Sequence, residues 1–504
     1  MCGKRCLHHE YNLSAQRRRC SIGGNSDSRF NFKLYTFNSS MPLTRPLDYT
    51  LPLCMIGTIL SLVFDLDAGA WLARVTLLLY LLVQWPRQAR MAKGILLVVM
   101  AMAGVVIWCE AQPVPVFLQA LDRLCFFATF VSSLGLLRVS AMRSRLVRDA
   151  GQTLIRQKPA LRYPTLSLGT ALFGIIINIG VLNLFGAMVM RSNTLKAAGG
   201  HDDIQQARER RMMLSILRGF ALAPLVSPLG VTMAVILANM PSLTWASLAP
   251  VALPTAGLFF LLGWWLDWQL RPKQLAQRVP ATQPPSLSPL IRFTLLALLI
   301  TLSVFAVALA GNLRLPVAVL IACPLAAILW MAKQRRRLGG GTGLRRSLTL
   351  LARHSRLIFG SNRGEIAVLG GSACLGALIT PLVDQHALHE LLLATHLQGA
   401  AMAVAAMLLV VGLAQVGLNP IVSVTLLASL LGDGVGVDPR ILAVGLMCAW
   451  SLSMISSPFT ASMLVLSQLI HRSPYRIAWH WNGLFFVLVV PMLALWIGVM
   501  TQWL

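Results

Sequence analysis

The sequence WSLSMISSPFTASMLVLS, residues 450–467, contains a Ser-Pro pair and several hydroxyl residues inside an otherwise apolar run. A second stretch, FALAPLVSPLGVTMAVIL at residues 220–237, has the same Ser-Pro centre. Proline removes one backbone N–H donor from a helix and clashes with the carbonyl group four residues earlier. Both stretches therefore predict apolar helices that are interrupted near the middle.

Composition places these stretches in a membrane protein. Of the 504 residues 56% are hydrophobic and only 12% are charged, with a mean hydropathy of +0.70, and such values exclude a soluble globular domain. Crossing about 30 Å of hydrocarbon takes about 20 apolar residues. We predict an all-α polytopic membrane protein with about eleven transmembrane helices, at residues 49–64, 68–85, 93–110, 116–140, 212–240, 243–268, 290–311, 314–333, 364–383, 441–470 and 478–503.

The positions of the charges predict the orientation in the membrane. The net charge of +26 comes from basic loops such as RQARMAK (87–93), RVSAMRSRLVRDAGQTLIRQK (138–158) and HRSPYR (471–476). The loops that alternate with them contain only two lysine or arginine residues, Arg314 and Arg440. An excess of lysine and arginine marks cytoplasmic loops. We expect a multi-pass protein of the bacterial inner membrane, surrounded by lipid, with a cytoplasmic N-terminus, a periplasmic C-terminus and no nucleic-acid partner.

Two further apolar segments, residues 162–190 and 398–432, each contain a polar residue near the middle. If residues 162–190 crossed the membrane fully, the basic cluster that follows would lie outside and every later loop would be inverted. We therefore predict that both segments are re-entrant hairpins. Unpaired backbone groups at a hairpin turn cost several kcal/mol in hydrocarbon, so such turns are buried in protein or line a wet cavity.

The two halves of the chain carry similar motifs in the same order. VSSLGLLRV aligns with SACLGALIT, GVLNLFGAMV aligns with VGLNPIVSVT, and the Ser-Pro stretches align with each other. These alignments pair Gly135 with Gly376, Asn183 with Asn419, Ser227 with Ser457 and Pro228 with Pro458, at offsets of 241, 236 and 230 residues. We predict two repeats of five helices and a hairpin. Because five is odd, the second repeat is inverted, as in many secondary transporters.

The repeats define the predicted domain organisation. A disordered basic extension (1–48) and a leading helix (49–66) precede the first repeat, which spans residues 67–270. A cytoplasmic linker (271–289) connects it to the second repeat, residues 290–504. The extension has no continuous apolar segment, so we do not expect a secretory signal peptide.

This order of helices, hairpins and breaks resembles the ion transporter superfamily over residues 49–504. Within the superfamily it resembles the divalent anion/sodium symporters, which carry dicarboxylates, citrate or sulfate. The resemblance implies a homodimer in which the hairpin tips and the helix breaks together hold substrate and sodium. Carried over to this sequence, the tips are Asn183 and Asn419 and the breaks are residues 224–232 and 455–462.

The residues at the breaks themselves predict the chemistry of a binding site. The prolines would free the carbonyl groups of Pro224 and Met454, which with nearby hydroxyl groups can coordinate a hard cation such as Na⁺. The N-termini of half-helices offer N–H groups and a positive dipole end to an anion. We expect a small anionic substrate, most simply an organic carboxylate, a coupling cation and no resident cofactor. The predicted binding residues are Asn183, Ser227, Pro228, Thr232, Asn419, Ser456, Ser457, Pro458, Thr460 and Ser462.

Polar residues outside the breaks leave alternatives open. Asp122, inside a predicted span, is either a proton relay or the partner of another polar group. The outer segment VDQHALHE holds Asp384, His386, His389 and Glu390, and it is either a metal site or a solvated loop.

Motifs of other protein classes are absent. The sequence has no phosphate-binding P-loop, catalytic triad pattern or zinc-protease motif, so we expect neither an enzyme nor an ATP-driven pump. Two alternatives to an anion carrier remain. One is an efflux permease for a toxic oxyanion such as arsenite or tellurite. The other is a membrane-embedded glycan polymerase or ligase, although such enzymes usually have a large outer loop and the outer loops here are short.

Overall fold

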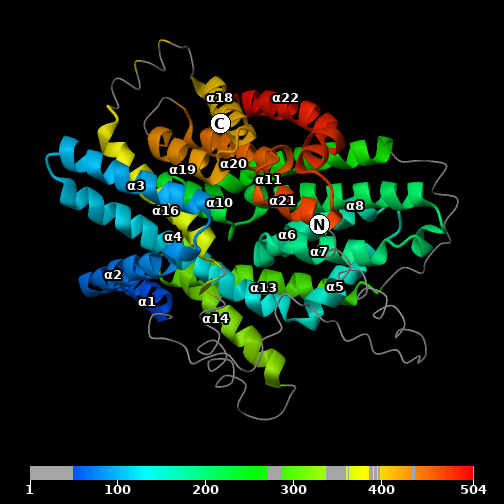
Figure 1. Cartoon of the computed structure of the whole chain (residues 1–504), viewed down its shortest axis with the longest axis horizontal. Coiled ribbons are helices and arrows are strands. Elements are labelled where there is room, and N and C mark those ends of the chain that lie inside the picture. Colours follow the sequence, from blue (N-terminus) through cyan, green and yellow to red (C-terminus); the bar gives the residue numbers. More distant parts are fainter. Residues whose placement is uncertain are drawn as a thin grey trace, which may run out of the picture. The chain divides into compact units, whose positions relative to one another are not determined.

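The computed structural model describes residues 49–270, 286–336, 359–360, 362–384, 390, 394, 398–432 and 437–502. These residues form helices, with no strand among them (Figure 1). Ten helices of this part of the chain are long and apolar enough to cross a membrane, which confirms the predicted all-α polytopic fold. The predicted extension (1–48), most of the linker (271–289), His386 and His389 lie outside the described residues.

The helices follow the predicted spans closely. The first half contains α1 (Thr50–Phe64), α2 (Asp67–Gln84), α3 (Arg90–Cys109), α4 (Pro113–Met142), α5 (Arg145–Ile155), α6 (Arg162–Ile177), α7 (Gly180–Ser192), α8 (Asp202–Ala221), α9 (Ala223–Val226), α10 (Val231–Asn239) and α11 (Trp245–Gln269). The second half contains α13 (Ser288–Ala310), α14 (Leu315–Arg336), α16 (Arg363–Ile379), α18 (Gly399–Gln415), α19 (Pro420–Leu431), α20 (Pro439–Ser456), α21 (Ala461–Ile470) and α22 (Gly483–Met500). The predicted span at 49–64 is α1, an apolar helix of 15 residues, shorter than the ten.

Helix α1 packs on α2 through glycine. The chain turns at Asp65, which has a positive φ of 49°, and α2 begins two residues later. A Cβ atom on Gly57 would lie 2.7 Å from the carbonyl oxygen of Gly69, and one on Gly69 would lie 2.9 Å from that of Gly57. Small residues let membrane helices approach this closely.

The basic segment 138–158 is not a loop throughout, contrary to the prediction. Helix α4 continues to Met142, and α5 follows with Val147, Ala150 and Leu154 buried. These residues recur at helical spacing, so α5 is an amphipathic helix with a buried apolar face. It packs against α6, α7 and α13.

Packing joins the two halves of the chain. Helix α4 of the first half packs on α16 of the second half. Helix α3 also packs on α16, and the equivalent helix of the second half, α14, packs on α4. Likewise α6 packs on α8 as α18 packs on α20. Exchanging the halves converts each of these contacts into its counterpart, as two similar repeats would require. The inverted orientation of the second repeat stays a prediction.

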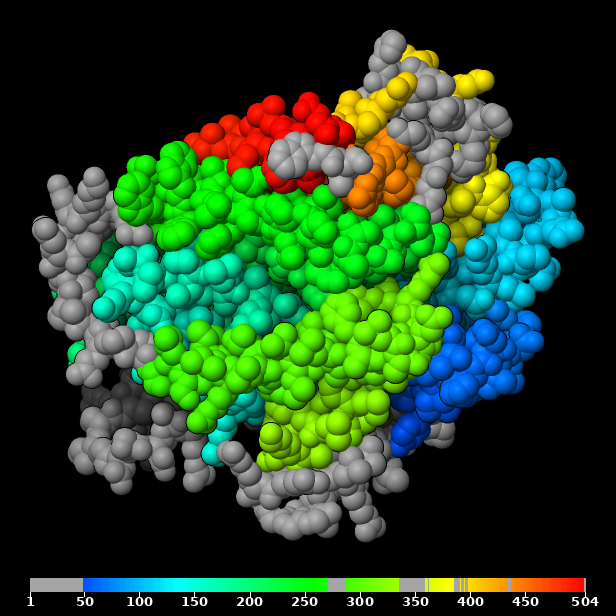
Figure 2. Space-filling view, turned by 180° about the vertical axis from the view of Figure 1, so that it is seen from behind, coloured from blue at the N-terminus to red at the C-terminus, as the bar shows by residue number. Residues whose placement is uncertain are grey.

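The outer surface suits contact with lipid. Helices α13 and α14 pack against each other, and they lie across the face shown in Figure 2. On α13, Leu295, Leu299 and Leu309 are exposed, which is the arrangement expected of a helix that faces hydrocarbon.

At the start of α20, Asp438 accepts hydrogen bonds from the guanidinium and the backbone N–H of Arg440. These bonds hold the pKa of Asp438 below its ordinary value.

We predict that Gly57→Ala destabilises the protein by about 1–3 kcal/mol, because the new Cβ meets backbone atoms of α2 that cannot move independently. The matched control is Gly94→Ala in α3, where a Cβ meets nothing within 4 Å. Thermal unfolding of the detergent-solubilised protein measures both. Equal unfolding midpoints for the two variants would show that the α1–α2 contact is not tight.

Candidate functional site

Both interrupted helices break at a serine that precedes proline. Ser227 (φ −93°, ψ 112°) and Ser457 (φ −83°, ψ 126°) adopt extended backbone, as a following proline ring favours. Helix resumes at Val231 and at Ala461, four residues after each serine. The structure thus interrupts the two helices at the predicted positions and with matching geometry.

Hydrogen bonds within the protein satisfy the backbone at the second break. Pro458 cannot donate to the carbonyl group of Met454, which instead accepts a hydrogen bond from the Ser462 hydroxyl at 2.9 Å. The next carbonyl, that of Ile455, accepts from Asn482 Nδ2 at 3.0 Å. The expectation of an open carbonyl at Met454 is therefore wrong, because Ser462 is already bound there.

The second break is also tied to the second hairpin. The Ser457 hydroxyl donates to the carbonyl oxygen of Ala414 at 2.6 Å, near the C-terminus of α18. Gln415 Nε2 donates to the Ser456 hydroxyl at 3.0 Å. These bonds make Ser456 and Ser457 connectors between α18 and α20.

The first break is different. The Ser227 hydroxyl oxygen is buried and has no hydrogen-bond partner among the described residues. It lies at the C-terminal end of α9, where backbone carbonyl groups give the negative end of a helix dipole. A buried polar atom without a partner is costly, so this hydroxyl points to a ligand or water.

The first hairpin turns at Asn178 and Ile179, between α6 and α7. Asn178 has φ 53° and ψ −140°, a conformation that costs most residues about 1–3 kcal/mol. Asn183 instead lies within α7 on its exposed side, so the prediction that Asn183 forms the tip is wrong. The segment GVLNLFG contains nothing that interrupts a helix. Pairing Asn178 with Asn419 gives an offset of 241 residues, the same as for Gly135 and Gly376.

The second hairpin turns where the sequence predicts. Between α18 and α19, Gly417 has φ 96°, and Asn419 is the N-cap of α19. The Asn419 side-chain oxygen accepts a hydrogen bond from the backbone N–H of Ile421 at 2.9 Å. An asparagine therefore stands at both hairpin turns.

Two cavities lie among these elements. The larger, of about 270 Å³, is lined by both hairpin turns and the second break, and its polar lining residues include Asn178, Glu365, Asn419, Ser457, Thr460 and Ser462. The smaller, of about 70 Å³, reaches the first break at Ser227 and Thr232. The cavities share Asn178, Phe220, Val231, Trp450 and Met454, so they adjoin. Of the predicted binding residues, Asn183, Pro228, Ser456 and Pro458 line neither cavity.

Four helices begin at the walls of these cavities. They are α7 after Asn178, α10 at Val231, α19 at Pro420 and α21 at Ala461. Each N-terminus carries roughly +0.5 elementary charge from the helix dipole, together with N–H groups outside the helical ladder. Among the described residues, the larger cavity is thus lined by helix N-termini and by no cationic side chain.

One carboxylate lines the larger cavity. Glu365, in the first turn of α16, forms an ion pair with Arg138 of α4 at 3.3 Å. The packing of α16 on α4 brings Glu365 to the hairpin turns. A contact between distant helices leaves no signal in the local sequence, so Glu365 could not be predicted there.

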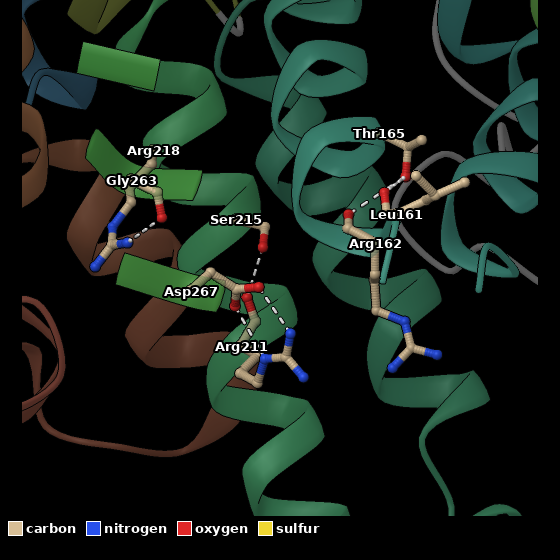
Figure 3. Close-up of polar contacts among 8 residues, drawn as sticks. All are labelled: Leu161, Arg162, Thr165, Arg211, Ser215, Arg218, Gly263 and Asp267. Atoms are coloured by element: carbon tan, nitrogen blue, oxygen red, sulfur yellow. Dashed lines mark hydrogen bonds and ion pairs between the residues drawn. The ribbon is translucent and has the colours of Figure 1, made fainter. Parts of the chain in front are cut away.

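Arg218 in α8 lies behind the second break. It is 5% exposed and donates to Asn482 Oδ1 at 2.9 Å. It also donates to the Gly263 carbonyl at 3.5 Å (Figure 3). Asn482 in turn donates to the Ile455 carbonyl. Asn482 thus connects the buried Arg218 guanidinium to the second break through two successive hydrogen bonds. The positive charge of Arg218 favours an anion near this break.

The upstream half of the first interrupted helix is anchored by an ion pair. Arg211 of α8 donates two hydrogen bonds, of 2.9 and 2.7 Å, to the Asp267 carboxylate of α11 (Figure 3). This bidentate ion pair fixes α8 against α11.

The remaining polar residues singled out in the sequence lie elsewhere. Asp122 accepts two hydrogen bonds, of 2.8 and 2.7 Å, from Arg74, and it lines neither cavity. This geometry favours the structural alternative over a proton relay. No cluster of metal-ligating side chains occurs among the described residues, which include Asp384 and Glu390 but neither histidine of that segment.

Comparison with known proteins leaves the family open. No protein-family model matches the chain, and no curated protein has a significantly similar sequence. Its structure is similar to the crystal structure of the Alcanivorax borkumensis YdaH transporter, which is described as having an unusual topology. The TM-score is 0.48 at 14% identity, over 78% of this chain and 90% of that chain. Because this likeness is too distant to argue from, the resemblance to the divalent anion/sodium symporters stays a prediction.

We predict that Asn178→Gly weakens anion binding at least about tenfold, because it removes an amide from both cavities. Glycine also adopts a positive φ without cost, so the unfolding midpoint stays at the wild-type value or rises. The matched control is Asn183→Ala in α7, which should bind as the wild type does. Anion-dependent shifts of the thermal unfolding midpoint measure binding. Weak binding by Asn183→Ala and wild-type binding by Asn178→Gly would restore Asn183 as the site residue.

Proposed function

We propose that the protein is a secondary active transporter that moves a small anion, most simply an organic carboxylate, by ion-coupled alternating access. The observation that carries this proposal is the convergence of four helix N-termini on two adjoining cavities. Interrupted helices of this kind hold substrates and coupling ions at the midplane of many transporters. The sequence repeat supports the same conclusion.

The larger cavity fits the proposed anion in size and chemistry. Its volume of about 270 Å³ lies below the range of pockets for drug-sized ligands, which begins at about 300 Å³. Asn178 and Asn419 place side-chain amides at the two hairpin turns. Amide donors together with helix N-termini suit a carboxylate or another oxyanion.

The smaller cavity supports a coupling cation. Its lining includes Thr232, Asn178 and the Ser227 hydroxyl, which has no hydrogen-bond partner among the described residues. The cavity also lies at the carbonyl end of α9. Neutral oxygen ligands at the negative end of a helix dipole suit a hard monovalent cation such as Na⁺. A cation there would stand beside the anion in the larger cavity, since the two cavities share Asn178.

We further propose that this conformation exchanges substrate with the cytoplasm. The larger cavity reaches Met91 and Glu365, in the first turns of α3 and α16, and the charge pattern assigns these helix ends to the cytoplasmic side. The proposed setting is the bacterial inner membrane, with the protein acting as a homodimer.

Gradient-driven flux tests the function. Purified protein in liposomes should accumulate labelled succinate, citrate or sulfate when an inward sodium gradient is imposed, and little when the gradient is absent. Arsenite and tellurite belong in the same panel, because the same cavity would serve an oxyanion permease. Failure of every anion to move under sodium, proton or counter-anion gradients would contradict the proposal.

We predict that Ser227→Ala raises the half-saturating sodium concentration about tenfold or more while the unfolding midpoint changes little, because one cation ligand is lost from an otherwise intact break. The matched control is Ser215→Ala on α8, whose hydroxyl donates to the Arg211 carbonyl within the same helix. The sodium dependence of uptake distinguishes them. Unchanged sodium dependence in Ser227→Ala would remove the smaller cavity as the cation site.

A further inference from the structure

Arg138 and Glu365 join the two halves of the chain beside the first hairpin turn. Arg138 Nη1 lies 3.3 Å from Glu365 Oε1, and Arg138 Nη2 donates to Asn362 Oδ1 at 2.6 Å. The aliphatic stem of Arg138 passes the start of α7, where a Cβ on Gly180 would lie 3.5 Å from its Cδ. The guanidinium is thus held at the hairpin turn by an amide and a carboxylate.

This ion pair is the loosest of those that join helices in the described part of the chain. Arg74–Asp122 and Arg211–Asp267 each form two hydrogen bonds of 2.7 to 2.9 Å. Arg138 and Glu365 share a single contact of 3.3 Å. A guanidinium binds a carboxylate best through two parallel hydrogen bonds, so the present contact leaves Arg138 below its full capacity.

The two partners differ in their access to the cavity. The Glu365 side chain is 41% exposed and lines the larger cavity, whereas the Arg138 side chain is 18% exposed. Glu365 is therefore the member of the pair that reaches the cavity, whereas Arg138 does not line it. A rotation of this one exposed side chain would open the Nη1 side of Arg138 to an anion in the cavity.

We propose that Arg138 binds a carboxylate group of the transported anion and that Glu365 occupies Arg138 when the cavity is empty. This inference rests on the proposed function and names a subsite within it. Exchange of one carboxylate for another keeps Arg138 paired both with and without substrate, so this half-buried cation is not left alone in either state. Release of substrate restores the Arg138–Glu365 pair. Asn362 holds the guanidinium in place during the exchange.

The exchange predicts opposite effects of the two charges. Glu365→Gln removes the competing carboxylate with little change of shape, so the anion concentration that half-saturates binding should fall about tenfold. Arg138→Gln removes the cation and should raise that concentration about tenfold or more, and Arg138→Lys should lie between Arg138→Gln and the wild type. If the ion pair is purely structural, Glu365→Gln and Arg138→Gln should both be less stable than the wild type. Anion binding would then stay unchanged in both variants or shift in the same direction in both.

The test is a titration of the thermal unfolding midpoint with succinate, citrate and sulfate at constant ionic strength, in wild type and variants. Asp122→Asn is the matched control, because it breaks an ion pair of α4 that lines neither cavity. Tighter binding in Glu365→Gln with weaker binding in Arg138→Gln supports the proposal. A stronger gain for the carboxylates than for sulfate identifies the group as a carboxylate.

Two outcomes would overturn it, and they are distinguishable. Wild-type flux together with unchanged or weaker binding in Glu365→Gln removes this subsite and leaves the proposed function standing. Neither binding nor gradient-driven flux of any anion in the wild type removes both.

Discussion

Backbone hydrogen bonding inside the membrane is the constraint on which this structure depends. Hydrocarbon offers no partner to a carbonyl or N–H group, so Pro228 and Pro458 are tolerated only where other groups replace the lost bonds. At Pro458 the replacements come from Ser462 and Asn482. At the first break the hydroxyl of Ser227 has no partner among the described residues. Two breaks of matching backbone geometry therefore differ in their capacity for a ligand, and on this difference we propose the first break as the site of the coupling cation.

Interrupting helices also creates the electrostatics of the site. A break near the middle of a helix turns the dipole ends toward the protein interior, and here four N-termini reach the two cavities. Arg218 adds positive charge behind the second break, and Glu365 is the carboxylate on the wall of the larger cavity. The proposed anion would meet these helix N-termini, and the nearby Ser227 hydroxyl is the proposed ligand of the compensating cation.

Much of the fold could be predicted from the sequence, because its signals are local. Apolar length sets the spans, and a proline within an apolar run sets each break. The first hairpin turn was misplaced by five residues, since the alignment of GVLNLFG with VGLNPIV matched neighbouring letters while the turn depends on a positive φ at Asn178. Helix α5 was missed because its charges mask a short apolar face.

The missing part of the site depends on contacts between distant segments. Glu365 reaches the cavity through the packing of α16 on α4, and Asn482 meets Ile455 through the packing of α22 and its preceding turn on α20. Neither residue has a neighbouring motif that indicates such a contact. Partner choice among polar residues in a bundle is set by helix packing, which no single sequence segment encodes.

We propose that the two hairpin turns and the two breaks form one binding site for an anion and a cation. Cryo-electron microscopy of the protein with sodium and a transported anion would locate both ligands. We expect density for the anion within hydrogen-bonding distance of Asn178 and Asn419, and density for the cation beside Ser227. Anion density elsewhere in the protein, with both asparagines unoccupied, would contradict it.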